Sequence, residues 1–149
     1  MLDVIAVGTD GSETAARAVE FAVELAARSQ ADLVVLSAYD DAPPGATAAA
    51  VAAAWAGPIA VDPDWVPQQE ERVRQMLARI ASGAEERGVG CRTDARGGDP
   101  AAVLVELAEQ HGADLLVVGN RGMERRVLGS VPNSVTHKAR CSVLVVKTN

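Results

Sequence analysis

The sequence has few aromatic residues, few cysteines and no long uninterrupted apolar run. Aromatic side chains make up 3% of its 149 residues, whereas hydrophobic residues make up 48%. That much apolar material can form a core, which excludes disorder as the global state. The core must then be aliphatic and rich in alanine. The length suits one domain, and we expect residues 1–149 to form it.

The scarcity of cysteine and of apolar runs also bears on the compartment. Two cysteines, Cys91 and Cys141, are too few for a disulfide framework, and they favour a reducing cytoplasm. Prolines and glycines break the uncharged stretch 42–61. Its uninterrupted part, residues 46–56, would make a helix of roughly 16 Å, against a bilayer core of about 30 Å. The chain reaches Asp3 without the basic segment of a secretory signal, so we expect no membrane association.

Positive charge is scarce overall but concentrated at one end. The chain has 14 Lys and Arg against 20 Asp and Glu, a net charge of −6. An acidic chain is a poor general binder of nucleic acid, because attraction to phosphate dominates that affinity. Residues 119–149 nevertheless hold six cations and one anion, a net +5, which leaves −11 on the first 118 residues. This basic end indicates either a local site for an anion or a solvated charged face.

Short apolar runs alternate with helical patterns along most of the chain. The first, second and fourth runs are apolar throughout, which is typical of strands covered by helices on both faces. This alternation, with right-handed crossovers, predicts a Rossmann-like three-layer α/β/α domain with a five-stranded parallel sheet of order 3-2-1-4-5. The expected strands are 3–8, 32–39, 89–95, 114–119 and 142–146; the expected helices lie near 15–26 and at 68–87, 101–111 and 130–138.

Residues 41–67 are the least regular part of the sequence. They hold most of the prolines and both tryptophans, Trp55 and Trp65. Alanine-rich residues 46–56 have helix propensity. We interpret the rest of this segment as a long loop or flap.

In a sheet of this order, ligands bind at the carboxyl ends of the strands where the order reverses. The turn after the first strand brings Asp10 to that crevice. The turn after the fourth strand brings Gly119 and Gly122, and Gly129-Ser130 opens a helix whose amides suit a phosphate. This pattern is neither a Walker A loop nor Gly-x-Gly-x-x-Gly. The alternative to an anion site is a structural role. In that case the glycines only allow the turns between strand and helix, and Asp10 is an ordinary turn residue.

Several segments of the chain together carry a family resemblance. They are Val4–Ser12, Gly98–Pro100, Ala113–Gly122, Leu128–Asn133 and Cys141–Val146. In combination they resemble the universal stress proteins, a family built on one adenine-nucleotide-binding α/β domain. The resemblance covers nearly the whole chain except residues 41–67.

The resemblance implies a site for an adenine nucleotide, ATP or AMP, with Mg²⁺ possible beside ATP. It implies a ribose contact at Asp10 and adenine contacts at Thr9, Ala38 and Val118. The basic end adds Arg121 to this anion site. The residues that the resemblance places at the phosphates are Gly119, Gly122, Gly129, Ser130 and Val131.

The spacer between the two glycine pairs departs from the family pattern. Nucleotide-binding members have nine residues there, whereas this chain has six, Met123–Leu128. Three residues are close to one helical turn, so a helical spacer would keep both ends in place. An extended spacer would open the site, with Arg125 and Arg126 left to offset the lost contacts. Adenosine or a monophosphate is therefore better supported than a triphosphate.

Two classes of function follow. The first is a nucleotide-binding stress or signalling module with at most slow ATP hydrolysis; the second is a dimeric interaction module with no nucleotide. No His/Cys spacing indicates zinc, and Ser12 lies in no nucleophile elbow. We also expect a homodimer, because strand 142–146 is an apolar sheet edge. An edge covered by the last helix or by residues 41–67 is the alternative.

Overall fold

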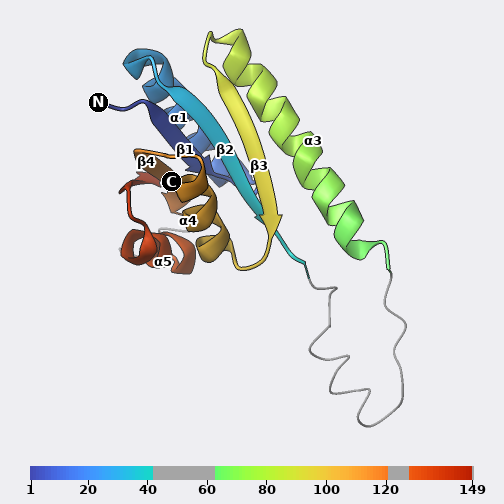
Figure 1. The fold of residues 1–149 in the computed structure, drawn as a ribbon. Helices are drawn as coiled ribbons and strands as arrows, with labels where there is room; N and C mark the ends of the chain where they lie inside the picture. Colours follow the sequence, from blue (N-terminus) through green and yellow to red (C-terminus); the bar gives the residue numbers. More distant parts are fainter. Residues whose placement is uncertain (42–62, 121–127, 149) are drawn as a thin grey trace, which may run out of the picture.

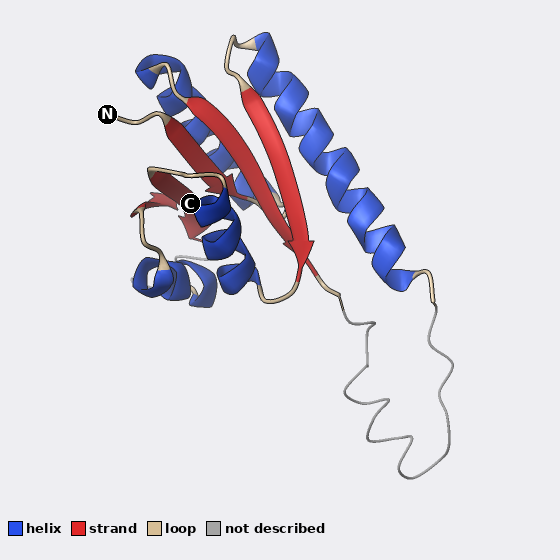
Figure 2. Ribbon diagram, in the orientation of Figure 1, coloured by secondary structure: helices blue, strands red, loops and turns tan. Residues whose placement is uncertain are grey.

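A computed structural model of the chain describes residues 1–41, 63–120 and 128–148. Five parallel strands form one sheet of order β3-β2-β1-β4-β5, as predicted (Figures 1 and 2). The strands are β1 (Val4–Gly8), β2 (Asp32–Tyr39), β3 (Cys91–Gly97), β4 (Leu115–Asn120) and β5 (Ser142–Lys147). The helices are α1 (Glu13–Ser29), α3 (Trp65–Glu86), α4 (Pro100–Gln110) and α5 (Ser130–Lys138). The three-layer Rossmann-like class predicted from the sequence is thus confirmed.

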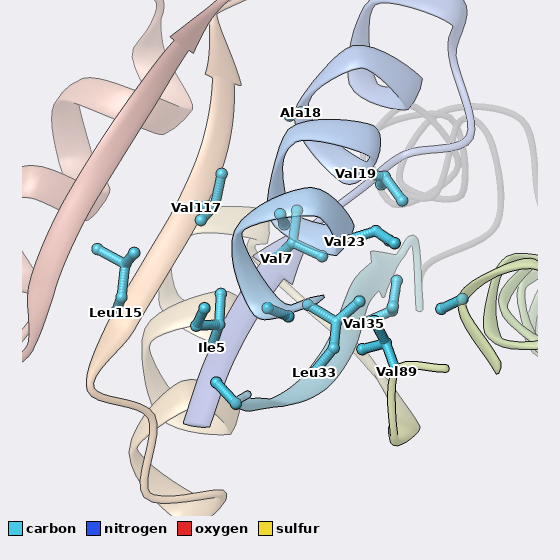
Figure 3. Packing of buried hydrophobic residues seen from close by; sticks show 14 of the residues in the cluster. Ile5, Val7, Ala18, Val19, Val23, Leu33, Val35, Val89, Leu115 and Val117 are labelled. Carbon is cyan, nitrogen blue, oxygen red and sulfur yellow. The ribbon is translucent and has the colours of Figure 1, made fainter. Parts of the chain in front are cut away.

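The core consists of two aliphatic clusters, one on each face of the sheet. Ile5 and Val7 of β1 point towards α1, where they cluster with residues such as Val23 (Figure 3). Leu77 of α3 belongs to the same cluster. The intervening Ala6 points to the opposite face, which α4 and α5 cover. Successive strand residues face opposite sides, so a strand covered on both faces must be apolar throughout.

An aspartate at the start of β4 holds that strand beside β1. Oδ2 of Asp114 accepts hydrogen bonds from the backbone amides of Asp3 and Val4, at 2.9 and 3.0 Å. These two backbone hydrogen bonds lower the pKa of the Asp114 carboxyl. The register that follows pairs Ile5 with Leu115. This register brings the carboxyl ends of β1 and β4 together.

α1 and α4 each begin after a residue whose side chain caps the helix. Ser12 Oγ accepts from the amide of Ala15 at 3.2 Å, and α1 begins at the next residue, Glu13. Asp99 caps α4 in the same way, with Pro100 in the first turn.

Most element boundaries lie within one residue of the expected ones, whereas α1, α3 and β3 differ by two or three residues at one end or both. α1 begins two residues before the expected helix at 15–26 and ends three residues after it. α3 begins at Trp65, three residues before the expected start, and includes Pro67. Proline is tolerated there because first-turn amides have no intrahelical acceptor. β3 begins at Cys91 rather than at Val89, which is buried but lies outside the strand. The helix expected at 46–56 lies outside the described residues.

The two cysteines lie at opposite edges of the sheet. Cys91 is in β3 and Cys141 immediately precedes β5, so the two thiols cannot pair within one chain. Burial raises the pKa of the Cys91 thiol to about 11 and raises that of Cys141 as well. Both thiols therefore stay protonated near neutral pH and are poor nucleophiles. Among the described helices, none has the length and apolar character needed to span a bilayer.

Candidate functional site

A cleft of about 440 Å³ lies at the carboxyl ends of β1 and β4, where the strand order reverses. Its walls come from the turn after β1, the end of β2, the end of β4 and the beginning of α5. Pro100 and Leu104 of α4 and Thr148 after β5 also line it. Eight of the predicted site residues lie in this lining: Thr9, Asp10, Ala38, Val118, Gly119, Gly129, Ser130 and Val131. The other two, Arg121 and Gly122, lie outside the described residues, as do Arg125 and Arg126.

Hydrogen bonds to β2 and within the turn itself hold the turn after β1. The amide of Thr9 donates to the carbonyl of Leu36 at 2.9 Å, and the hydroxyl of Ser37 donates to the carbonyl of Thr9 at 2.7 Å. Asp10 Oδ1 accepts from the amide of Ser12 at 3.0 Å. Asp10 is exposed and lines the cleft, so its carboxylate is accessible to a ligand.

The end of β2 directs main-chain groups into the cleft. Successive strand residues direct their amide and carbonyl to opposite neighbours, because the backbone repeats every two residues. The carbonyl of Leu36 accepts on the β1 side, from Thr9, and that of Tyr39 accepts on the β3 side, from Gly98. Ala38 therefore directs its amide and carbonyl towards the β1 side, beyond Gly8, the last residue of β1.

The amino terminus of α5 supplies amide donors. First-turn amides have no intrahelical acceptor, and Pro132 has no amide hydrogen to donate. The amide of Gly129, the N-cap, donates to Asn120 Oδ1 at 2.9 Å. The amides of Ser130 and Val131 remain as first-turn donors, and the Ser130 hydroxyl lies beside them at the same wall of the cleft.

The sequence analysis missed two residues that shape this wall. Thr148 is buried, and its Cγ2 lies 3.2 Å from the place that a Cβ on Gly119 would occupy. Asn120 is buried behind Gly129. Asn120 occupies a variable position of the Gly-x-x-Gly motif, and Thr148 follows the last strand in no motif. A single sequence carries no signal for either residue.

A second cleft, of about 500 Å³, lies between α1 and α3. Val19, Val23 and Ile80 contribute to its largely apolar lining, and Arg79 and Arg87 also line it. It shares Thr9 and Ser12 with the first cleft but includes no residue of β4 or α5. The four predicted phosphate-binding residues that the structure describes, Gly119, Gly129, Ser130 and Val131, therefore line the first cleft and not the second.

Neither catalytic residues nor metal ligands were predicted from the sequence. No group of three or more His, Cys, Asp and Glu within them is arranged to hold a metal ion. Nε2 of His111 lies 2.8 Å from Asp94 Oδ2, and Nδ1 of His137 lies 2.7 Å from the carbonyl of Asn133. Neither histidine lines the cleft between β1 and β4.

The parallel sheet with a helix amino terminus at its switch point defines a Rossmann-like α/β domain. A profile of the Universal stress protein family matches residues 1–147, and the chain belongs to this family.

Known relatives match the chain over nearly its full length. Universal stress protein Rv1636 of Mycobacterium tuberculosis is 36% identical over 97% of this chain and 95% of its own. A universal stress protein solved in complex with cAMP is 31% identical, with a TM-score of 0.72, over 99% of this chain and 98% of its own. A universal stress protein family protein from Arabidopsis thaliana, solved with AMP bound, shares the fold at 22% identity. Its TM-score is 0.66, over 99% of this chain and 92% of its own.

Proposed function

We propose that this chain binds an adenine nucleotide of the ATP or AMP type in the cleft between β1 and β4. It then acts as a stress-response or signalling module in the cytoplasm, with at most slow ATP hydrolysis. One observation carries the proposal: a single cleft is lined by the end of β2, the turn after β1 and the amino terminus of α5, where we expect the base, the ribose and the phosphate to bind. The cAMP complex of a 31% identical family member supports the same ligand class.

The base is recognised at the end of β2. Ala38 directs one main-chain donor and one main-chain acceptor beyond the end of β1. Adenine offers the matching pair on its Watson–Crick edge, an N6 donor beside an N1 acceptor. Guanine offers an O6 acceptor beside an N1 donor, which reverses the order. This main-chain pair therefore favours adenine over guanine.

The phosphate is bound at the beginning of α5. Two amides, of Ser130 and Val131, and the Ser130 hydroxyl suit one phosphate group, and the helix dipole favours its negative charge. Further phosphates of ATP would rely on residues 121–127. Mg²⁺ usually binds through one or two carboxylates together with substrate phosphates, and Asp10 is a cleft carboxylate. Mg²⁺ would therefore enter with ATP, held mainly by the ligand's phosphates.

Calorimetry with matched ligands tests this function. Nucleotide carried through purification is first released by denaturation and identified by mass, and the emptied, refolded protein is then titrated with AMP, adenosine and GMP. We expect adenine-containing ligands to bind and GMP to bind at least tenfold more weakly. Binding of neither AMP nor adenosine would contradict the proposal.

Replacement of Asp10 by alanine is expected to weaken AMP and adenosine binding by about 0.5–3 kcal/mol, because the ribose hydroxyls lose a charged acceptor. The matched ligand is the 2′,3′-dideoxy form of AMP, which has no hydroxyl for Asp10 to accept from. Its affinity should be the same for wild type and Asp10→Ala. Equal losses for AMP and its dideoxy form would assign Asp10 to the turn rather than to the ribose.

We propose further that the chain forms a homodimer through β5. β5 is an edge strand, and its central residues, Val143–Val146, are only partly buried in the single chain. α5 packs mainly against α4 rather than over this edge. Antiparallel pairing of β5 with its twin would satisfy the open backbone groups and bury the apolar side chains under two-fold symmetry.

Substitution of Leu144 by proline is expected to abolish the dimer. Proline removes a backbone donor and blocks strand pairing at the centre of the edge. Sedimentation should show a wild-type dimer at micromolar concentration and a monomer or aggregate for Leu144→Pro. Leu144→Ala keeps the backbone donor and should remain dimeric. A wild-type chain that sediments as a monomer at high micromolar concentration would exclude this interface.

The shortened spacer, Met123–Leu128, favours one competing function. Under this competing function, the chain is a dimeric interaction module whose cleft holds no nucleotide. The same titrations separate the two functions, because the competing function predicts a dimer that binds neither AMP nor adenosine.

A further inference from the structure

Asn120 joins three segments of the chain at the back of the cleft. It is the last residue of β4 and has no exposed surface. Its side-chain Oδ1 accepts from the amide of Gly129 at 2.9 Å, nine positions further along the chain. Its backbone carbonyl accepts from the hydroxyl of Thr148 at 2.7 Å. The carbonyl of Thr148 in turn accepts from Arg17 Nη1 of α1 at 3.0 Å.

The orientation of the Asn120 carboxamide follows from its partner. Gly129 offers a donor, so the oxygen of the carboxamide must face it, and Nδ2 must face the other way. In that position Nδ2 is buried and has no hydrogen-bond partner within the described part of the chain. A buried donor without an acceptor is unfavourable for stability. Within the described residues, the orientation that lets Asn120 Oδ1 accept from the Gly129 amide therefore leaves the Nδ2 donor without an acceptor.

The bond between Asn120 and Gly129 closes the connection between β4 and α5. We propose that Asn120 is the positioning residue of the phosphate subsite: it fixes the first turn of α5, so that the Ser130 and Val131 amides face the cleft before the ligand arrives. This inference rests on the proposed nucleotide function. Ordering these donors in advance removes an entropic cost from binding. It also offers a way for a chain with a six-residue spacer to keep the site, because the side chain of Asn120 links the end of β4 directly to the N-cap of α5.

The test compares a ligand that has a phosphate with one that lacks it. Asn120→Ala is titrated with AMP and with adenosine, and Asn133→Ala is the matched control, since Asn133 is an exposed asparagine on α5, the helix whose first turn Asn120 holds. We expect Asn120→Ala to bind AMP at least tenfold more weakly than wild type, with less than a twofold change for adenosine. Asn133→Ala should change neither affinity by more than twofold. Amide exchange of Gly129, followed by NMR, should accelerate in Asn120→Ala only.

Thr148→Val serves as a second variant if Asn120→Ala does not fold. It replaces the hydroxyl that donates to the Asn120 carbonyl by a methyl group. We expect the affinity for AMP to fall two- to fivefold and the affinity for adenosine to change by less than twofold. If wild type binds AMP and adenosine but the variants lose both equally, or lose neither, the positioning role is overturned and the proposed function stands. If wild type binds neither ligand, the proposed function itself fails.

Discussion

The Gly129→Asp variant is expected to bind AMP at least about 100-fold more weakly than wild type, a loss of about 3 kcal/mol. Gly129 is the N-cap of α5, with φ −61° and ψ 168°, an extended conformation that any residue adopts. Aspartate is among the best N-cap residues, so the helix should persist. Its carboxylate would occupy the phosphate's place at the helix amino terminus and repel the ligand's charge. Calorimetry measures the loss.

Gly129→Asn separates charge from shape. Asparagine has nearly the same size as aspartate. In both variants an ideal Cβ at position 129 lies 3.3 Å from Asn120 Oδ1. We expect a loss of about tenfold or less for this variant, because only the charge is absent. Both variants should melt within a few degrees of wild type. A folded Gly129→Asp protein with wild-type affinity for AMP would refute the placement of the phosphate.

The largest expected effect on stability comes from Leu116→Ala, which should lower the free energy of unfolding by about 3 kcal/mol. Leu116 is in β4 between Ala6 of β1 and Val143 of β5, and it has no exposed surface. Its side chain packs in the cluster covered by α4 and α5, so truncation leaves a cavity that the sheet cannot close. Urea unfolding measures the loss, and the melting temperature should fall by roughly 6–12 °C.

The matched control for this truncation is Leu128→Ala. Leu128 is 41% exposed, so its truncation removes little buried surface. We expect the free energy of unfolding to change by no more than about 0.5 kcal/mol. Equal losses for the two variants would contradict the assignment of Leu116 to the core.

The fold was predictable because its determinants are local. β1, β2 and β4 are apolar on both faces, and Asp99-Pro100 marks the start of α4 through a short-range hydrogen bond. The beginning of α3 was not predictable in this way. The sequence pattern predicts an irregular segment around Pro67, whereas a first-turn position tolerates this proline because no intrahelical bond is lost.

The candidate site was predictable where its residues follow strand ends. Topology alone brings Asp10 and Gly119 to one crevice, the family resemblance adds Ala38, and all three line one cleft. The roles of Asn120 and Thr148 depend on contacts between β4, α5 and the residues after β5, which are distant in sequence. Neither composition nor spacing reveals that the Gly129 amide is already bonded, which leaves Ser130 and Val131 as the donors.

The central claim, that an adenine nucleotide occupies the cleft between β1 and β4, is tested most directly by mapping AMP onto the backbone amides by NMR. We expect the largest shift changes at Thr9, Ala38 and Gly119, and at the α5 amides of Ser130 and Val131. Changes confined to the cleft between α1 and α3, at residues such as Met76 and Gly83, or no change at saturating AMP, would contradict the account.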